Sequence, residues 1–202
     1  MDPASLISVI IKAIILLVLI LFIIALIKGF ISIYNQLVSK RQAVNGRWAD
    51  VDAFLQKRMD LIPNLVETVK GYAKHEKETL TEVQQARSAA TNSFGATDPV
   101  AIAEAMKKQS GLAGALSKLM MVTENYPDLK ANANFQDLQN KLSNIETEIS
   151  SARELYNSTV EEYNAYLLSF VTNIVNMFSL KYKEMPFFKA DDTARVAPKV
   201  VF

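Results

Sequence analysis

The stretch RMDLIPNLVETVKGYAKHEKETL, residues 58–80, holds the signals that decide how this chain folds. Asp60 is a good residue for capping the start of a helix. Pro63 is tolerated in a first helical turn, where its missing N–H is not needed. We therefore predict a tight turn at Met59 and Asp60 and a new helix from Leu61. A single continuous helix, kinked at Pro63, is the alternative.

Apolar residues recur at helical spacing on both sides of this stretch. The pattern predicts helices at about 31–58, 61–93, 99–126 and 135–180, the third of them capped by Asp98 before Pro99. No alternating strand pattern competes with it. Four long helices with short connections predict an all-α fold, an antiparallel up-and-down four-helix bundle over residues 31–180.

Residues 1–30 form a separate part of the chain. Leu6 to Ile27 is apolar except for Ser8 and Lys12, and as a helix it would measure roughly 33 Å, the thickness of a bilayer core. A cleaved signal peptide would have a shorter apolar run with basic residues before it. We therefore predict an uncleaved transmembrane helix that continues into the first helix of the bundle.

Charges flanking this segment predict its orientation. Lys28, Lys40, Arg41 and Arg47 follow it, whereas little net charge precedes it. Basic flanks stay in the cytoplasm. We therefore expect a single-pass protein with its N-terminus outside and its bundle in the cytoplasm.

The C-terminal tail, residues 181–202, breaks the helical pattern with Pro186 and Pro198 and ends in apolar residues. Such a tail needs cover. It either packs along its own bundle or binds a neighbouring subunit, and the sequence leaves both readings open. As oligomer or partner contacts we expect five phenylalanines of helix four and the tail, namely Phe170, Phe178, Phe187, Phe188 and Phe202.

Catalytic chemistry has few candidates. The chain has no cysteine and one histidine, His75. A zinc-protease helix needs a second histidine four positions on, where this chain has Thr79. The neighbouring Glu76 and Glu78 point away from His75 on a helix. We predict no catalytic, cofactor-binding or metal residue. The net charge of +1 and the lack of a basic patch also argue against nucleic-acid binding.

Glu76 falls on the apolar stripe of its helix, where a charge is rarely left unpaired. A turn near Asp60 would place it level with Arg47. We therefore predict a buried polar pair between Glu76 and Arg47. Access of water to Glu76 in a widened bundle is the alternative.

Several segments together resemble the LemA family: YNQLV at 34–38, the run RQAVNGRWADVDAFLQKRMDLIPNLVETVKGYAKHEKETLTEVQQAR at 41–87, ENYPDLKANANFQDLQNKL at 124–142 and IETEISSARELYNSTVEEYNAYLLSF at 145–170. The tail agrees through PFF at 186–188 and PKV at 198–200. Members often read Phe-Pro where this chain has Phe170–Val171, so we expect helix four to continue unbroken past Phe170.

The resemblance implies a bacterial protein with an N-terminal membrane anchor and a helical bundle, and it brings no catalytic activity or cofactor. It points toward membrane organisation. We therefore expect a non-enzymatic inner-membrane scaffold that self-assembles through its bundle, with the lipid bilayer and further copies as partners. The alternative is an adaptor or regulatory partner of a membrane protease or envelope-stress system.

Overall fold

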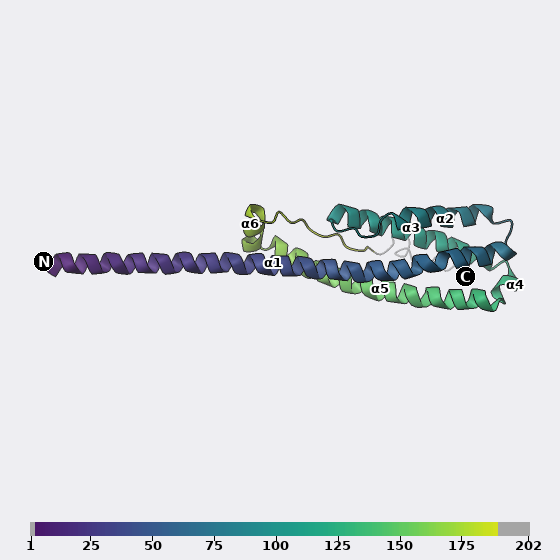
Figure 1. The fold of residues 1–202 in the computed structure, drawn as a ribbon, viewed down its shortest axis with the longest axis horizontal. Coiled ribbons are helices and arrows are strands. Elements are labelled where there is room, and N and C mark those ends of the chain that lie inside the picture. Colours follow the sequence, from purple (N-terminus) through teal and green to yellow (C-terminus); the bar gives the residue numbers. More distant parts are fainter. Residues whose placement is uncertain (1–2, 190–202) are drawn as a thin grey trace, which may run out of the picture.

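The computed structural model describes residues 3–189. One helix, α1 (Pro3–Tyr72), runs through the whole length of the molecule. Its 70 residues correspond to about 105 Å at 1.5 Å per residue. Figure 1 shows the first part of α1 standing alone and the rest packed against the other helices. The candidate membrane segment and the bundle therefore share one rigid axis.

Five further helices follow: α2 (Lys77–Thr91), α3 (Pro99–Thr123), the short α4 (Pro127–Lys130), α5 (Ala133–Leu168) and α6 (Phe170–Phe178). The long helices alternate in direction (Figure 1), with α5 beside α1 and the α2–α3 hairpin covering the end far from the N-terminus. Residues 3–189 contain no strand. The predicted all-α class is confirmed, and the Asp98 cap of α3 forms as predicted, accepting from the Val100 and Ala101 N–H groups at 3.0 Å.

The predicted turn at Met59 and Asp60 is wrong, because α1 continues to Tyr72 and the chain turns at 73–76. Pro63 cannot donate to the Met59 carbonyl one turn before it. Arg87 of α2 fills this gap, since its Nε donates to the Met59 oxygen at 3.3 Å. Asp60 caps no helix; it accepts from Gln56 within α1 at 2.8 Å. The chain instead forms the alternative, a single helix that continues through Pro63.

The expectation of an unbroken fourth helix is also wrong. Ser169 has extended backbone angles, φ −61° and ψ 142°, and separates α5 from α6 without any proline. Its hydroxyl donates to the Tyr166 carbonyl at 2.8 Å, and its own carbonyl accepts from the Asn173 N–H at 2.8 Å. Ser169 therefore ends one helix and starts the next. In Figure 1, α6 projects to one side of α1 instead of running along it.

The core divides into two clusters along the bundle. The membrane-proximal cluster includes Leu37, Val44, Trp48, Tyr156 and Tyr163. The distal cluster is largely aliphatic and draws on all four long helices; its members include Ile62, Leu65, Val83, Leu112, Leu119 and Leu142.

Arg58 lies at the boundary between these clusters and is completely buried. Its guanidinium donates to the Gln109 side chain of α3 at 2.7 Å and to Glu146 of α5 at 2.9 Å. A buried charge is tolerated only when it is paired and hydrogen-bonded. Arg58 therefore joins three helices at one level of the bundle.

Candidate functional site at the membrane-proximal end

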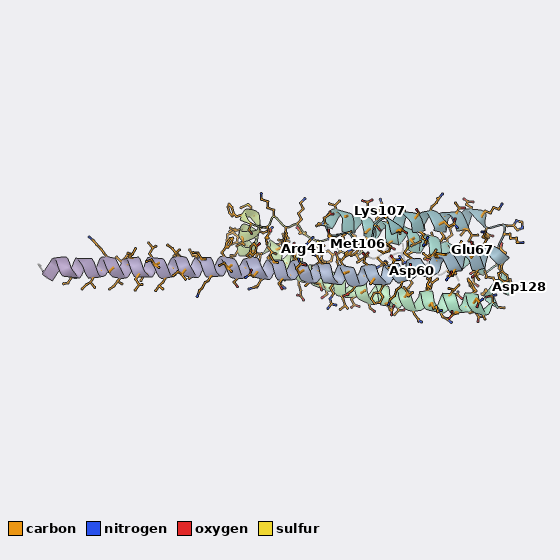
Figure 2. All side chains as sticks on the ribbon, in the orientation of Figure 1. Arg41, Asp60, Glu67, Met106, Lys107 and Asp128 are labelled. Carbon is orange, nitrogen blue, oxygen red and sulfur yellow. The ribbon has the colours of Figure 1, made fainter. Side chains whose placement is uncertain are left out.

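The first part of α1 is long and apolar enough to cross a membrane. Its side chains are exposed around the helix, for example Leu17, Phe22 and Leu26, and Figure 2 shows them projecting on all sides of α1 with no other element near. A signal sequence would pass the same test of length and composition. Here, however, the apolar helix continues without interruption into the core of the bundle.

An extended segment follows α6 and returns along the bundle; we call residues 180–189 the strap. Three asparagine side chains bind its backbone. Asn157 donates to the Phe188 carbonyl at 3.0 Å and accepts from the Phe188 N–H at 2.9 Å. Asn164 binds Met185 in the same two ways, at 3.0 and 2.9 Å. Asn176 does so with Tyr182, at 2.9 and 2.8 Å.

Two tyrosines of α5 add to these contacts. The Tyr156 hydroxyl donates to the Pro186 carbonyl and the Tyr163 hydroxyl to the Lys183 carbonyl, both at 3.0 Å. Burial raises the pKa of both phenols, so they stay protonated and able to donate. The bonds recur every seven residues on α5, about 10.5 Å of helix, and every three residues on the strap, roughly 10 Å of extended chain. The spacing of the donors along α5 therefore matches the spacing of the carbonyl groups along the strap.

Arg41, labelled in Figure 2, contacts the strap from α1, whereas the preceding contacts come from α5 and α6. Its guanidinium lies 5.9 Å from the ring centre of Tyr163 and 5.8 Å from that of Tyr182. It also donates to the Thr97 carbonyl, between α2 and α3, at 2.8 Å. One side chain thus connects α1 to α5, to the strap and to the α2–α3 connection.

A shallow groove runs between α1 and α5 on the outside of the bundle. Its floor includes Ala53, Phe54 and Leu155, and charged residues of both signs lie along it, namely Arg47, Asp50, Lys57 and Glu148. Leu155 is 51% exposed. No other described element covers this face.

The predicted pair between Glu76 and Arg47 is wrong. Arg47 instead donates to Asp50 on its own helix at 3.3 Å. Glu76 accepts from the Tyr126 hydroxyl at 3.0 Å, which raises the pKa of that phenol. The reason is the position of the turn, because α1 runs on for about 38 Å beyond Arg47 before the chain reverses.

His75 lies exposed in the turn after α1. The hollow beside it is lined by Lys70, Lys74 and Lys77, whose charges repel a metal cation. Within residues 3–189, no group of three His, Asp or Glu side chains could hold a metal ion.

The five predicted contact phenylalanines divide into two groups. Phe170 and Phe178 of α6 are 80% and 76% exposed, and Phe187 of the strap is also exposed. Phe188 instead packs inside its own bundle, with ring centres 6.0 Å from Trp48 and 5.6 Å from Tyr156. Phe202 lies outside the described residues. As far as residue 189, the tail packs along its own bundle.

Comparison with known proteins identifies the family of this chain. The model of the LemA family matches residues 47–202. The chain belongs to the LemA family. Protein LemA of Metamycoplasma hominis is 28% identical over 182 residues, covering 88% of this chain and 80% of that protein.

Two magnetosome proteins are also similar to this chain over a comparable length. Magnetosome protein MamQ 2 of Paramagnetospirillum magneticum is 23% identical over 205 residues, covering 90% of this chain and 75% of its own. Magnetosome protein MamQ of Magnetospirillum gryphiswaldense is 22% identical with the same coverage. The family and these relatives describe a membrane-associated helical protein.

Sequence reasoning missed the residues of this LemA chain that bind the strap. The signal was present, because Tyr-Asn occurs at 156–157 and again at 163–164. A seven-residue repeat of polar residues is readily taken for a solvated helix face. It marks instead a row of backbone-binding side chains under the tail.

Proposed function

We propose that this LemA-family protein is a non-enzymatic scaffold of the bacterial inner membrane. Copies stand in the bilayer through the apolar part of α1 and associate side by side through the groove between α1 and α5. This association gathers the anchors and organises the membrane around them. The observation that carries the proposal is the continuity of α1 from the span to the end of the bundle.

That continuity gives every copy the same groove at the same height above the bilayer. Two copies related by a two-fold axis along the membrane normal would place α1 of one copy against α5 of the other. Phe54 would then meet Leu155 of the second copy. Isologous interfaces of this kind need a self-complementary surface. The groove fits this requirement, since its apolar floor is accompanied by charges of both signs.

We place the bundle on the cytoplasmic side because Lys28, Lys40 and Arg41 follow the apolar segment. The magnetosome relatives support a membrane-organising role by their names alone. The absence of cysteine makes the proposal easy to test, because any introduced cysteine is the only thiol in the chain.

The test is thiol crosslinking of full-length protein in native-like membranes. Cells that carry both a Phe54→Cys and a Leu155→Cys variant should give a crosslinked pair. The matched control pairs Phe54→Cys with Gln85→Cys, an exposed position on α2, and should give none.

Particle size completes the test. A Leu155→Lys variant should shift the extracted particles from two copies to one, whereas Met121→Lys, at an exposed site on α3, should not. Wild-type particles that hold one copy at every membrane density would overturn the scaffold. Particles that hold one copy and one stoichiometric foreign protein, such as a membrane protease, would establish the adaptor role instead.

A further inference from the structure

The helix α6 carries its apolar side on the outside. None of its nine residues is charged, and Phe170, Val171, Ile174, Met177 and Phe178 are between 41% and 80% exposed. At 100° per residue these five side chains form one stripe roughly 120° wide. A surface helix of a water-soluble domain normally turns such a stripe toward the core.

The opposite side of α6 is the one that packs. Thr172 and Val175 are buried, at 2% and 5% exposure. The orientation of the helix is also fixed at both ends, because Ser169 separates it from α5 and the Asn176 side chain binds the backbone of Tyr182 twice. The apolar stripe is therefore held outward by specific bonds.

The position of α6 matches the surface of the bilayer. After Lys12 the apolar run of α1 meets its next charge at Lys28, and its large exposed apolar side chains extend to Ile31. Coverage of α1 by other elements begins at Ile33, Tyr34 and Leu37. Of the packed helices, α6 is the one nearest the free part of α1 in Figure 1.

Lys28 and Ile33 are separated by only about 7.5 Å along a helix. Each headgroup region of a bilayer is of the order of 5–8 Å thick. If the apolar run fills the hydrocarbon core, α6 lies in the headgroup region. Because it projects to one side of α1, it then lies along the membrane surface, as interfacial amphipathic helices do.

We infer that α6 is an interfacial helix. Its exposed apolar stripe enters the headgroup side of the leaflet that faces the bundle, and this gives the bundle a second attachment to the membrane. The occupant of this stripe is lipid. Phe30 and Ile31 of α1, just before the part of α1 that other elements cover, are exposed as well. Lys181 and Lys183, both exposed directly after α6, lie within reach of lipid phosphates. This inference does not depend on self-assembly.

The second attachment has a mechanical consequence. A bundle held by one helix is free to rotate about that helix. A bundle held also by α6 presents fixed faces relative to the membrane plane, and α6 adds area to one leaflet only.

The test measures the surroundings of a fluorophore on single cysteines in full-length protein in vesicles. An environment-sensitive dye on Met177→Cys should emit blue-shifted light and lose fluorescence when lipids carry a quencher near the headgroup. Leu26→Cys in the span is the positive control, and Gln85→Cys on α2 is the negative control. Vesicles of phosphatidylcholine, with and without phosphatidylglycerol, show whether anionic headgroups strengthen the effect.

A second variant tests the stripe itself. Phe170→Asp with Phe178→Asp should abolish quenching at Met177→Cys while the thermal melt of the bundle stays unchanged, because both side chains are exposed. Val100→Asp, which replaces an exposed apolar residue on α3, should leave quenching intact.

Two outcomes would overturn the inference. Emission from Met177→Cys that matches the Gln85→Cys control would place α6 in water. A blue shift without lipid quenching, which disappears when the protein is diluted into more lipid, would show that a second copy covers α6.

Discussion

The membrane-proximal and distal halves of the bundle are built in different ways. The distal half is a largely aliphatic core to which all four long helices contribute. The proximal core receives Ile102 and Ala105 from α3, but nearest the membrane α1 and α5 extend beyond the α2–α3 hairpin. The strap and α6 cover them there, through asparagine and tyrosine side chains that bind the backbone of the strap. Both halves have an apolar core, and the proximal half adds a row of matched polar contacts to the strap.

The largest expected effect is at the layer between the two halves, which consists of Arg58 and its partners Gln109 and Glu146. Arg58→Ala leaves a cavity and an unpaired buried Gln109, so we expect a loss of about 3–5 kcal/mol in unfolding free energy. Arg58→Met combined with Gln109→Leu should recover most of it. Glu146→Gln keeps an acceptor for Arg58 but removes the charge that balances this buried cation; because Glu146 is 45% exposed and water screens part of the loss, the change should cost about 1–3 kcal/mol. Thermal melts in detergent measure all three, and an unchanged melt for Arg58→Ala would contradict the role of this layer.

A smaller and local effect is expected at the strap. Asn164→Ala removes both bonds to Met185, which is buried, at a cost of about 2 kcal/mol. Amide hydrogen exchange should speed up in the strap, while the distal cluster keeps its protection. Asn144→Ala, at an exposed position of the same helix, is the control. Equal loss of protection in both halves would show that they unfold as one unit.

The third prediction concerns the contact that lets α1 pass through Pro63. Arg87→Gln should cost about 1 kcal/mol in the wild-type chain, because the Met59 carbonyl loses its partner. In a Pro63→Ala background the helix supplies that bond itself, so the same change should cost almost nothing. A double-mutant cycle measures this coupling. Additive effects would rule it out.

The smallest effect is a dependence on pH at Asp52. Burial raises its pKa above the ordinary 3.8, although the bond from the Gly95 N–H opposes the shift. The folded state therefore holds the proton more tightly, and this contribution to stability is lost as pH rises from 3.8 through the folded pKa. Asp52→Asn should flatten this slope and be at least as stable near neutral pH. Lower stability of the variant there would mean that the charge itself is needed at Gly95.

Some features were readable from the sequence because they depend on local periodicity. The apolar run of Leu6–Ile27, the all-α class and the Asp98 cap of α3 follow from residue types within a few turns of one another. The expected turn at Asp60 failed because a distant residue, Arg87, satisfies the carbonyl that Pro63 leaves without a donor. The expected continuation past Phe170 failed because Ser169 separates the two helices without a proline.

The same reasoning explains the candidate site. The exposure of Phe170 and Phe178 could be anticipated as an excess of apolar surface, whereas the internal use of Phe188 could not. Its place is fixed by two bonds from Asn157, thirty-one residues earlier. No pattern within one helix reports such a contact.

The sequence by itself determined that this is a helical protein with an apolar first segment and amphipathic helices, because hydrophobic periodicity is a local property of the chain. Only the tertiary structure decided where α1 ends, how the strap is held and which side of α6 is turned outward. Those outcomes depend on hydrogen bonds and packing between residues far apart in the chain, whose partners are chosen only when the helices meet.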